Sequence, residues 1–574
     1  MRGSLLRAPL LVCLAAVLFA LSFPNPLVRE GLPFLAWIAY VPVFFLVYRT
    51  GLWACALWGA LYGYLAYLLF NYWLADFHPL AGLVVHGLSL LYMAALFLLF
   101  RLAVVAFPRG AFLAHWVIWL AYEYLGTLGF LGYPYGISGY TQWRAVPLIG
   151  IADIFGVWGV SALVVFPSAW FAGAFAPAGL FGTLPRMGPK GSVGSRVSAF
   201  FAAVPARIAG FRAGRLPAVL WTLALAAALL YGSLAGSDPS GYPKARIALI
   251  QPNSDPWTGG PEEFRRDFDV LRRLSDRALA EGPGLVVWPE TAFVPRIHWH
   301  LTYREAEGRE LWLLVSDFLE YMATQDVPFV VGNHDARRDF AGNRRDYNAA
   351  ILFEGGEMTE VYRKMHLVPF TEHFPFADLF PGIHRALLNA DTHFWDPGTE
   401  RTVFAGPGFA FSTPICFEDS FGYISGDFVR SGAEVLVNLS NDAWAGSLSS
   451  QNQHLAMAVF RAVENRRSMV RSTASGQTAA IDPNGRILAM ARPFSEEYLV
   501  VEVPIVRDRI TVYNRFGDFL GRGFALIAAG ILITGGTLCI LKRAERNRPS
   551  VSDGTSKTGA GPAGPAKKAQ NGRP

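Results

Sequence analysis

The sequence predicts a two-part protein, in which a multi-span α-helical membrane bundle of about eight helices carries one α/β domain. Three observations predict this class. The 574 residues are 52% hydrophobic and only 16% charged, which is more apolar material than one soluble domain buries. Apolar runs of membrane-spanning length fill residues 1–236 and recur near the C-terminus. Between them, short β-rich runs alternate with amphipathic stretches.

Apolar runs suited to membrane helices occur at eight places in the chain. The first follows Arg2 and Arg7 and looks like a signal peptide, but no small-x-small cleavage site follows it, so we interpret it as a retained helix. The predicted spans are 8–21, 33–48, 52–70, 80–100, 111–130, 155–175, 216–234 and 519–541.

Basic residues in the short loops predict the orientation of the bundle. Arg49, Arg109 and Lys542 follow alternate spans, and the stretch 177–215 carries several basic residues and no acidic one. These positions all fall on one side if both termini are cytoplasmic. The net charge of +6 is thereby explained without nucleic acid, because the basic residues cluster beside apolar helices rather than among aromatic residues.

The segment 242–506 has the texture of an α/β layer fold. Predicted strands are 245–250, 284–288, 328–332, 349–353, 409–415, 434–439 and 478–481, and predicted helices are 261–280 and 455–464. In such folds, chemistry lies at the carboxyl ends of strands. The chain therefore divides into a membrane domain (1–236), a catalytic domain (242–506), a last span (519–541) and a disordered cytoplasmic tail (549–574).

Three reactive side chains stand out in this segment, and two of them, Glu290 and Cys416, directly follow predicted strands. Cys416 is the only one of four cysteines outside an apolar run, and it stands in Ser-Thr-Pro-Ile-Cys-Phe-Glu-Asp. Glu290 ends Val-Val-Trp-Pro-Glu, and Lys364 lies in Tyr-Arg-Lys-Met-His-Leu-Val-Pro-Phe. Taken singly, each has a plainer interpretation as a structural cysteine, a loop carboxylate or a surface lysine. Together they can supply a nucleophile, its base and a cation.

These motifs resemble the Glu-Lys-Cys triad of the nitrilase, or carbon-nitrogen hydrolase, superfamily. The setting between the seventh and eighth spans resembles the apolipoprotein N-acyltransferase family. The resemblance implies an extracytoplasmic αββα sandwich with Glu290, Lys364 and Cys416 as catalytic residues. It further implies supporting or substrate-binding roles for Glu372, Glu418, Trp257, Asn348, Phe370, Phe417 and Trp444. Phe417 departs from the family, in which a tyrosine is expected.

The chemistry of the triad follows from its residue types. Glu290 takes the thiol proton, and the Cys416 thiolate attacks an ester carbonyl. The Lys364 ammonium lowers the thiol pKa and, with a backbone N–H, stabilises the oxyanion. The resulting thioester then waits for a second nucleophile. No metal or cofactor is required.

The resemblance implies phospholipid-dependent N-acylation of the S-diacylglyceryl cysteine at the N-terminus of lipoproteins, by ping-pong transfer. The implied partners are a phospholipid donor, a diacylglyceryl-lipoprotein acceptor and the bilayer, with no nucleic acid. The implied location is the bacterial inner membrane, with the catalytic domain on the periplasmic side, and the chain is expected to act as a monomer.

Two segments are candidates for the lipid entry path. Residues 373–381 combine aromatic and apolar side chains with prolines, and we interpret them as a lid, with ordinary loop packing as the alternative. Tyr133 and Tyr135, in the loop after the fifth span with Tyr140 and Trp143, are expected to form a wall of that path.

Two rival functions stay open from the residues alone. One is a membrane-tethered amidase that uses water as acceptor, against which the number of spans argues. The other is a transporter or lipid-binding protein with an inactive domain, against which we count the intact triad and the absence of a charged residue marking an ion path in the spans. His298 and His300, expected on one side of an extended segment, lack further ligands for a metal.

Overall fold

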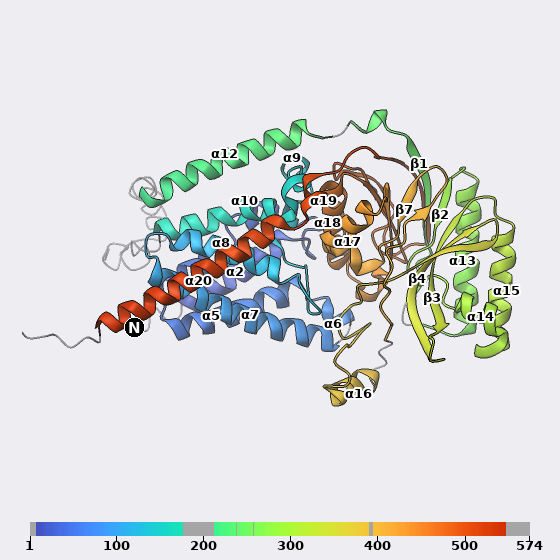
Figure 1. The fold of residues 1–574 in the computed structure, drawn as a ribbon, viewed down its shortest axis with the longest axis horizontal. Coiled ribbons are helices and arrows are strands. Elements are labelled where there is room, and N and C mark those ends of the chain that lie inside the picture. Colours follow the sequence, from blue (N-terminus) through green and yellow to red (C-terminus); the bar gives the residue numbers. More distant parts are fainter. Residues whose placement is uncertain are drawn as a thin grey trace, which may run out of the picture.

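The computed structural model describes residues 7–77, 79–175, 212–236, 238–255, 258–389 and 394–546. Apolar helices gather at one end of an elongated molecule and two sheets at the other (Figure 1). The predicted class, a helical bundle carrying an α/β domain, is confirmed. Trp257, most of the basic stretch 177–215 and the tail 549–574 lie outside the described residues.

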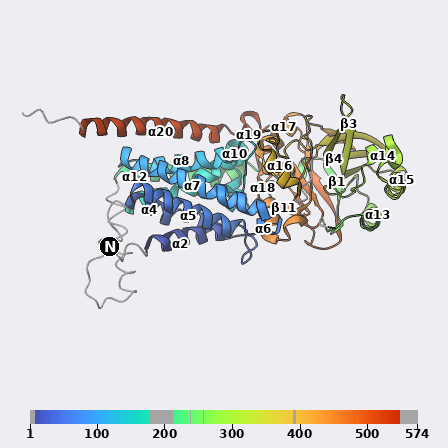
Figure 2. The ribbon, with the colours of Figure 1, turned by 90° about the horizontal axis from the view of Figure 1, so that it is seen from below.

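The helices of the bundle follow the predicted runs. They are α2 (Arg7–Ser22), α3 (Pro33–Ala36), α4 (Val41–Arg49), α5 (Leu52–Phe70), α6 (Leu74–Phe77), α7 (Pro79–Ala106), α8 (Ala111–Leu125), α9 (Val146–Ile149), α10 (Ala152–Phe175), α12 (Arg212–Leu234) and α20 (Phe519–Arg546). Within the described residues, five of them, α5, α7, α10, α12 and α20, are long and apolar enough to cross a membrane. The chain is therefore a membrane protein. The helix α20 runs along the outside of the bundle, and its last turn lies far from the sheets (Figure 2).

Two predicted spans are wrong in their bounds. Residues 33–48 are not one helix, because the chain turns between α3 and α4, and Pro42 lies in the first turn of the second helix. Proline favours a first helical turn, where its missing N–H leaves no bond unmade. The span predicted to reach residue 130 ends at Leu125, because the glycine-containing loop that follows does not continue α8 although it remains apolar.

Glu123 is a charged residue inside the fifth predicted span, which the sequence interpretation overlooked. Its side chain is buried in α8. The indole of Trp119 donates to its carboxylate at 2.9 Å, and the backbone N–H of Ser138 donates at 3.0 Å. These bonds satisfy one oxygen of the carboxylate and fix the loop after α8 to the bundle.

The α/β domain contains two six-stranded sheets. The first has the order β12-β1-β2-β3-β4-β5 and the second β11-β10-β9-β8-β7-β6. The strands are β1 (Lys244–Gln251), β2 (Leu285–Val287), β3 (Phe329–Arg338), β4 (Arg344–Glu354), β5 (Glu357–Arg363), β6 (Phe404–Ala405), β7 (Ala410–Ser412), β8 (Val435–Ser440), β9 (Ser468–Thr473), β10 (Ala479–Ile481), β11 (Ile487–Met490) and β12 (Glu497–Pro504). In each sheet, the three strands at its centre run parallel.

Alternate residues of β1 show how the layers pack. Ile247 and Leu249 belong to the core between the two sheets, whereas Ala248 and Ile250 pack against the helices outside the first sheet. The outer helices are α13 (Pro261–Leu279), α14 (Ile297–Tyr303) and α15 (Arg309–Ala323) on the first sheet, and α17 (Gly422–Arg430) and α18 (Leu448–Asn465) on the second. Because the central strands are covered on both faces, they are apolar without alternation, and the fold is an αββα sandwich.

Sequence patterns missed the strands β5, β6, β9, β11 and β12. The strand β9 is fully buried although it includes Arg471, whose charge is balanced by Asp419. The strand β12 pairs antiparallel with β1 at the edge of the first sheet and exposes part of its length. The strand β9 lacks the continuous apolar run that identified β1 and β8, whereas β12 has such a run, 498–501, which the sequence interpretation overlooked.

The helix α18 joins the sandwich to the bundle. Arg461 donates to Tyr140 at 3.2 Å, and Glu464 accepts from the backbone N–H of Val157 at 3.1 Å. Just beyond the helix, the guanidinium of Arg466 lies 2.8 Å from the carboxylate of Asp153 in α10, with both side chains at most 3% exposed. These buried contacts fix the sheets at one end of the bundle.

Replacing Asp153 with alanine is expected to destabilise this junction. The change leaves the Arg466 guanidinium buried without its carboxylate, which costs about 3–5 kcal/mol for pairs of this kind. Thermal unfolding of the purified protein in detergent measures the effect. The control is Glu30→Ala, which breaks an exposed pair with Arg144 and should change stability by no more than about 1 kcal/mol. Equal melting temperatures for the two variants would contradict this assignment.

Candidate active site

Glu290, Lys364 and Cys416 meet where the two sheets face each other. Glu290 follows β2, Lys364 follows β5, and Cys416 begins the short 3-10 helix η4 (Cys416–Ser420) after β7. The Lys364 ammonium lies 3.2 Å from a Glu290 oxygen. Both charges are close enough to shift the pKa of the Cys416 thiol. The structure thus brings together the three residues predicted to be catalytic.

Lys364 is a buried ammonium held by two carboxylates. Its side chain is 1% exposed and donates to Glu372 at 2.8 Å as well as to Glu290. Burial alone would lower the pKa of the ammonium, but Glu290 and Glu372 raise it well above its usual value. The group is therefore charged at neutral pH. Glu372, predicted as a supporting residue, also accepts from the Val368 N–H at 2.7 Å.

Two further donors fix the carboxylate of Glu290. The side-chain amide of Asn348, on β4, donates to one oxygen at 2.7 Å, and the backbone N–H of Asn441 donates to the other at 2.8 Å. With Lys364, they hold a carboxylate that is only 5% exposed. Asn348 therefore orients the carboxylate of Glu290, the candidate base. This hydrogen bond is a physical basis for the supporting role predicted for Asn348.

Cys416 occupies a strained position at the end of β7. Its φ angle is +49°, a left-handed conformation that costs energy for a residue with a side chain. The amide of Asn438 donates to the carbonyl groups of Pro414 and Cys416 and holds this turn. Burial raises the pKa of the Cys416 thiol, Glu290 raises it further, and Lys364 lowers it, with a net rise. The resting thiol is therefore neutral and needs a base.

Glu418 also holds the turn at Cys416, through hydrogen bonds to backbone N–H groups. Its carboxylate is fully buried and accepts from the backbone N–H groups of Ile415, Met365 and His366 at 2.8, 2.8 and 3.0 Å. The hydroxyl of Tyr362 donates to both of its oxygens. Glu418 thus ties the cysteine turn to the segment that follows Lys364. The side chain supports the site and does not reach the cavity.

A four-membered charge network that sequence patterns did not reveal lies behind the cysteine. Asp419 contacts His454 at 2.6 Å and pairs with Arg471, and Asp442 contacts the same two residues at 3.1 and 3.3 Å. Burial would lower the pKa of His454, but the two carboxylates raise it to about 9. Since Asp419 belongs to the cysteine turn and Asp442 follows Asn441, the network connects the turn at Cys416 to the segment that holds Glu290.

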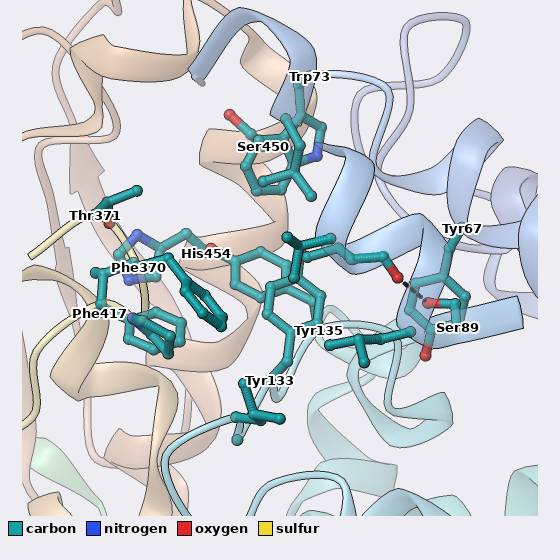
Figure 3. Close-up of a pocket in the computed structure, with 18 of the residues that line it drawn as sticks. Tyr67, Trp73, Ser89, Tyr133, Tyr135, Phe370, Thr371, Phe417, Ser450 and His454 are labelled. Carbon is teal, nitrogen blue, oxygen red and sulfur yellow. Dashed lines mark hydrogen bonds between the residues drawn. The ribbon is translucent and has the colours of Figure 1, made fainter. Parts of the chain in front are cut away.

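A cavity of about 470 Å³ adjoins Cys416 and is lined mainly by apolar side chains. Its walls come from both halves of the molecule, with Phe370, Phe417 and His454 on one side and Tyr67 and Ser89 of the bundle on the other (Figure 3). Trp444, another predicted supporting residue, also lines it. Tyr133 and Tyr135 lie between the two sides, as expected for a wall, whereas Tyr140 and Trp143 do not line the cavity.

Phe417 packs as an ordinary aromatic side chain of this wall. Its ring lies 5.0 Å from that of Phe421 and 5.9 Å from that of His366. The Nε2 atom of His366 is buried without a partner.

The predicted lid, 373–381, is an irregular segment followed by α16 (Pro381–Asn389), which projects beside the sandwich (Figure 1). Phe374 is buried against Phe370, whereas Leu379 is 69% exposed. Ile383 and Leu387 of α16 line the cavity. The apolar surface of this segment therefore begins at the site and continues to the outside.

The prediction for His298 and His300 is wrong in its secondary structure. Both lie on the helix α14, in which Ile297, Trp299 and His300 are buried. The ring of His300 bonds the carbonyl of Arg304. In the part of the chain that the structure describes, no group of three or more His, Cys, Asp or Glu side chains could hold a metal ion.

Comparisons with known proteins identify similar chains. The family model for the apolipoprotein N-acyltransferase N-terminal domain matches residues 15–170, and that for carbon-nitrogen hydrolase matches 246–511. Apolipoprotein N-acyltransferase 1 of Treponema denticola is 45% identical over 89% of this chain and 93% of its own. The protein of the same name from Treponema pallidum is 46% identical over 93% and 96%, and apolipoprotein N-acyltransferase of Geobacter metallireducens is 32% identical over 91% and 95%.

Among solved structures, a nitrilase-superfamily protein of Saccharomyces cerevisiae matches 47% of this chain and 93% of its own, with 21% identity and a TM-score of 0.34. An amidase from Nesterenkonia, of the same superfamily, matches 49% and 97%, with 18% identity and a TM-score of 0.35.

Gly332 on β3 is expected to be required for the position of Glu290. A Cβ atom added there would lie 2.0 Å from the Pro289 carbonyl oxygen and 2.8 Å from the Glu290 Cα. Gly332→Ala should therefore displace the base and slow acylation of Cys416 by an activated ester at least about tenfold. Intact-protein mass spectrometry follows the reaction. The control is Gly284→Ala, because the atoms nearest to a Cβ added there lie 3.7 Å from it. An acylation rate for Gly284→Ala as low as that for Gly332→Ala would contradict this argument.

The stabilisation contributed by His454 should depend on pH. Its pKa is about 9 in the folded protein and about 6.5 when unfolded, so its charge stabilises the fold fully below pH 6.5 and ceases to do so as the pH rises through 9. His454→Gln should therefore lower the melting temperature most at pH 6.5. The difference from the wild type should shrink towards pH 9.5, and a difference independent of pH would rule out a charged His454.

Proposed function

This chain belongs to the apolipoprotein N-acyltransferase family, and we propose that its acyl donor is a phospholipid and its acceptor the N-terminal S-diacylglyceryl cysteine of lipoproteins. The chain is an acyltransferase, and lipoprotein N-acylation is its activity. The observation that carries the proposed mechanism is the meeting of Glu290 and Lys364 beside Cys416, at a cavity shared with membrane helices.

The first half-reaction forms a thioester. The Glu290 carboxylate takes the thiol proton as the Cys416 sulfur attacks the ester carbonyl carbon of the lipid. The Lys364 ammonium stabilises the oxyanion of the tetrahedral intermediate, because its charge is held in a buried site. The carbon–oxygen bond to the glycerol then breaks. Glu290 returns its proton to the leaving oxygen, and the lysophospholipid departs as an alcohol.

The second half-reaction uses the amine of the acceptor. The amine nitrogen attacks the thioester carbonyl, Glu290 removes a proton from that nitrogen, and the carbon–sulfur bond breaks. The proton on Glu290 then returns to the thiolate, which restores the resting thiol. An amide of the lipoprotein cysteine is the product, and protons balance over the two steps without a metal or a nucleotide.

The apolar cavity accounts for the choice of acceptor. Tyr92 of α7, Leu131 after α8 and Ile383 of α16 line the cavity and are 41–49% exposed, so the cavity reaches the surface beside the bundle. In a membrane, this opening faces lipid rather than water. Both substrates carry diacylglycerol chains and can enter there. A water molecule would have to cross the same apolar wall, which disfavours hydrolysis of the thioester.

The membrane placement is part of the proposal. We place the chain in the bacterial inner membrane, with the sandwich on the periplasmic side and both termini in the cytoplasm, as the basic loops indicate. We retain the domains 1–236, 242–506 and 519–541 with a cytoplasmic tail at 549–574, and a monomer as the active form.

Replacement of Cys416 tests the proposed function. Purified enzyme, phospholipid and a diacylglyceryl lipopeptide should yield a lipopeptide heavier by one acyl chain, detected by mass spectrometry. Cys416→Ala should abolish this product, because it removes the sulfur on which the thioester forms. Cys416→Ser should retain little activity, since an alcohol ionises far less readily than a thiol.

Unchanged melting temperatures are the control for folding in both variants. Full transfer by Cys416→Ala would contradict the mechanism. Release of free fatty acid in place of acylated lipopeptide by the wild type would favour a membrane-tethered hydrolase instead.

A further inference from the structure

Tyr135 is a phenol that the membrane half of the molecule contributes to the active-site cavity. It belongs to the loop between α8 and the short helix η1 (Ser138–Gln142). In Figure 3 it lies between the catalytic-side residues Phe417 and His454 and the bundle residues Tyr67 and Ser89. Within the described residues, no side chain or backbone group is hydrogen-bonded to its hydroxyl, and the oxygen is not sealed from the cavity.

The hydroxyl groups of the other tyrosines that line the described part of the cavity are bonded to each other, enclosed by protein or at the exposed rim. The hydroxyl groups of Tyr67 and Tyr122 lie 3.3 Å apart and bond each other. The hydroxyl of Tyr133 is enclosed by protein. Tyr92 lies at the exposed rim. Tyr135 is therefore the tyrosine whose hydroxyl can meet a ligand deep in the cavity.

Neighbouring rings hold Tyr135 in place. Its ring stacks on that of Tyr133, with centroids 4.9 Å apart and planes at 20°, and contacts the ring of Trp73 at 5.5 Å. The indole N–H of Trp73 donates to Gln453 on α18 at 3.1 Å. The phenol is thus fixed to both halves of the molecule, so a hydrogen bond from it costs little conformational entropy.

The charges around Tyr135 make its hydroxyl a donor. Burial raises the pKa of Tyr135, and the nearby Asp442 carboxylate and Cys416 sulfur raise it further. The phenol therefore keeps its proton at neutral pH. It lies close to the reacting sulfur, yet on the bundle side of the cavity, where bound acyl chains would be surrounded by apolar walls.

We propose that the Tyr135 hydroxyl binds the second ester of a diacylglycerol lipid, the one that Cys416 does not attack. This inference rests on the proposed function. When one ester carbonyl is at the sulfur, the other is only a few bonds away, and leaving it unpaired in an apolar cavity would cost binding energy. A lipid with one ester replaced by an ether lacks this acceptor.

A double-mutant cycle between protein and lipid tests this hydrogen bond. The rate of Cys416 acylation is measured by intact-protein mass spectrometry for wild type and Tyr135→Phe, with diacyl phosphatidylethanolamine and with its two mono-ether analogues. The analogue that still acylates the enzyme retains the reacting ester and lacks the other carbonyl. Tyr133→Phe is the matched control, because it removes a hydroxyl enclosed by protein.

With the diester lipid, Tyr135→Phe should be slower than wild type by roughly three- to tenfold, the value of a neutral hydrogen bond. With the ether analogue, wild type should lose the same factor, and the two enzymes should react alike. For Tyr133→Phe, the ratio of the acylation rate with the diester lipid to that with the ether analogue should equal the wild-type ratio.

Equal rates of wild type and Tyr135→Phe on the diester lipid would overturn the proposal, and so would a defect that persists on the ether analogue. Absence of any acyl-enzyme in the wild type is a different result, because it would refute the proposed function itself.

Discussion

The burial of one ammonium between two carboxylates is the constraint on which this site depends. Lys364 has almost no exposure to solvent and is held by Glu290 and Glu372. A buried charge of this kind is tolerable only when its partners are fixed, because removal of either leaves an uncompensated ion. The strands β2 and β5 deliver Glu290 and Lys364, and the loop after Lys364 returns Glu372 to the same point. The positions of β2, β5 and the loop after Lys364 therefore bring the charged groups of Glu290, Lys364 and Glu372 together.

The neutral thiol of Cys416 follows from this arrangement. One ammonium faces two carboxylates, and burial disfavours a further anion, so the sulfur keeps its proton until substrate is bound. In the proposed mechanism, Glu290 then acts as the base at the moment of attack. The left-handed turn at Cys416 is held by Asn438, Glu418 and the Asp419 network, which together maintain a conformation that the backbone alone would not adopt.

Sequence patterns predicted the triad because each member lies in a distinctive motif, and two of them, Glu290 and Cys416, follow short apolar runs; the strand β5 before Lys364 is not apolar and was missed. They also located the bundle helices, since a membrane span is long and uniformly apolar. They missed β9 and the Asp419–His454–Asp442–Arg471 network, because buried charges that satisfy one another are separated in sequence and look like surface residues. The helix at His298 was mistaken for an extended segment because seven residues are too short for periodicity to decide. The free hydroxyl of Tyr135 depends on packing from both domains, which no local pattern contains.

The central claim is that an acyl group rests on Cys416 between two half-reactions, and a pulse and chase tests it most directly. The purified enzyme is incubated with phospholipid alone, freed of lipid, and examined by intact-protein mass spectrometry before and after addition of a diacylglyceryl lipopeptide. The account predicts one fatty-acyl mass on the enzyme, removed by neutral hydroxylamine and transferred to the lipopeptide in the chase. An enzyme that stays unmodified with phospholipid, yet acylates the lipopeptide when both substrates are present, would contradict it.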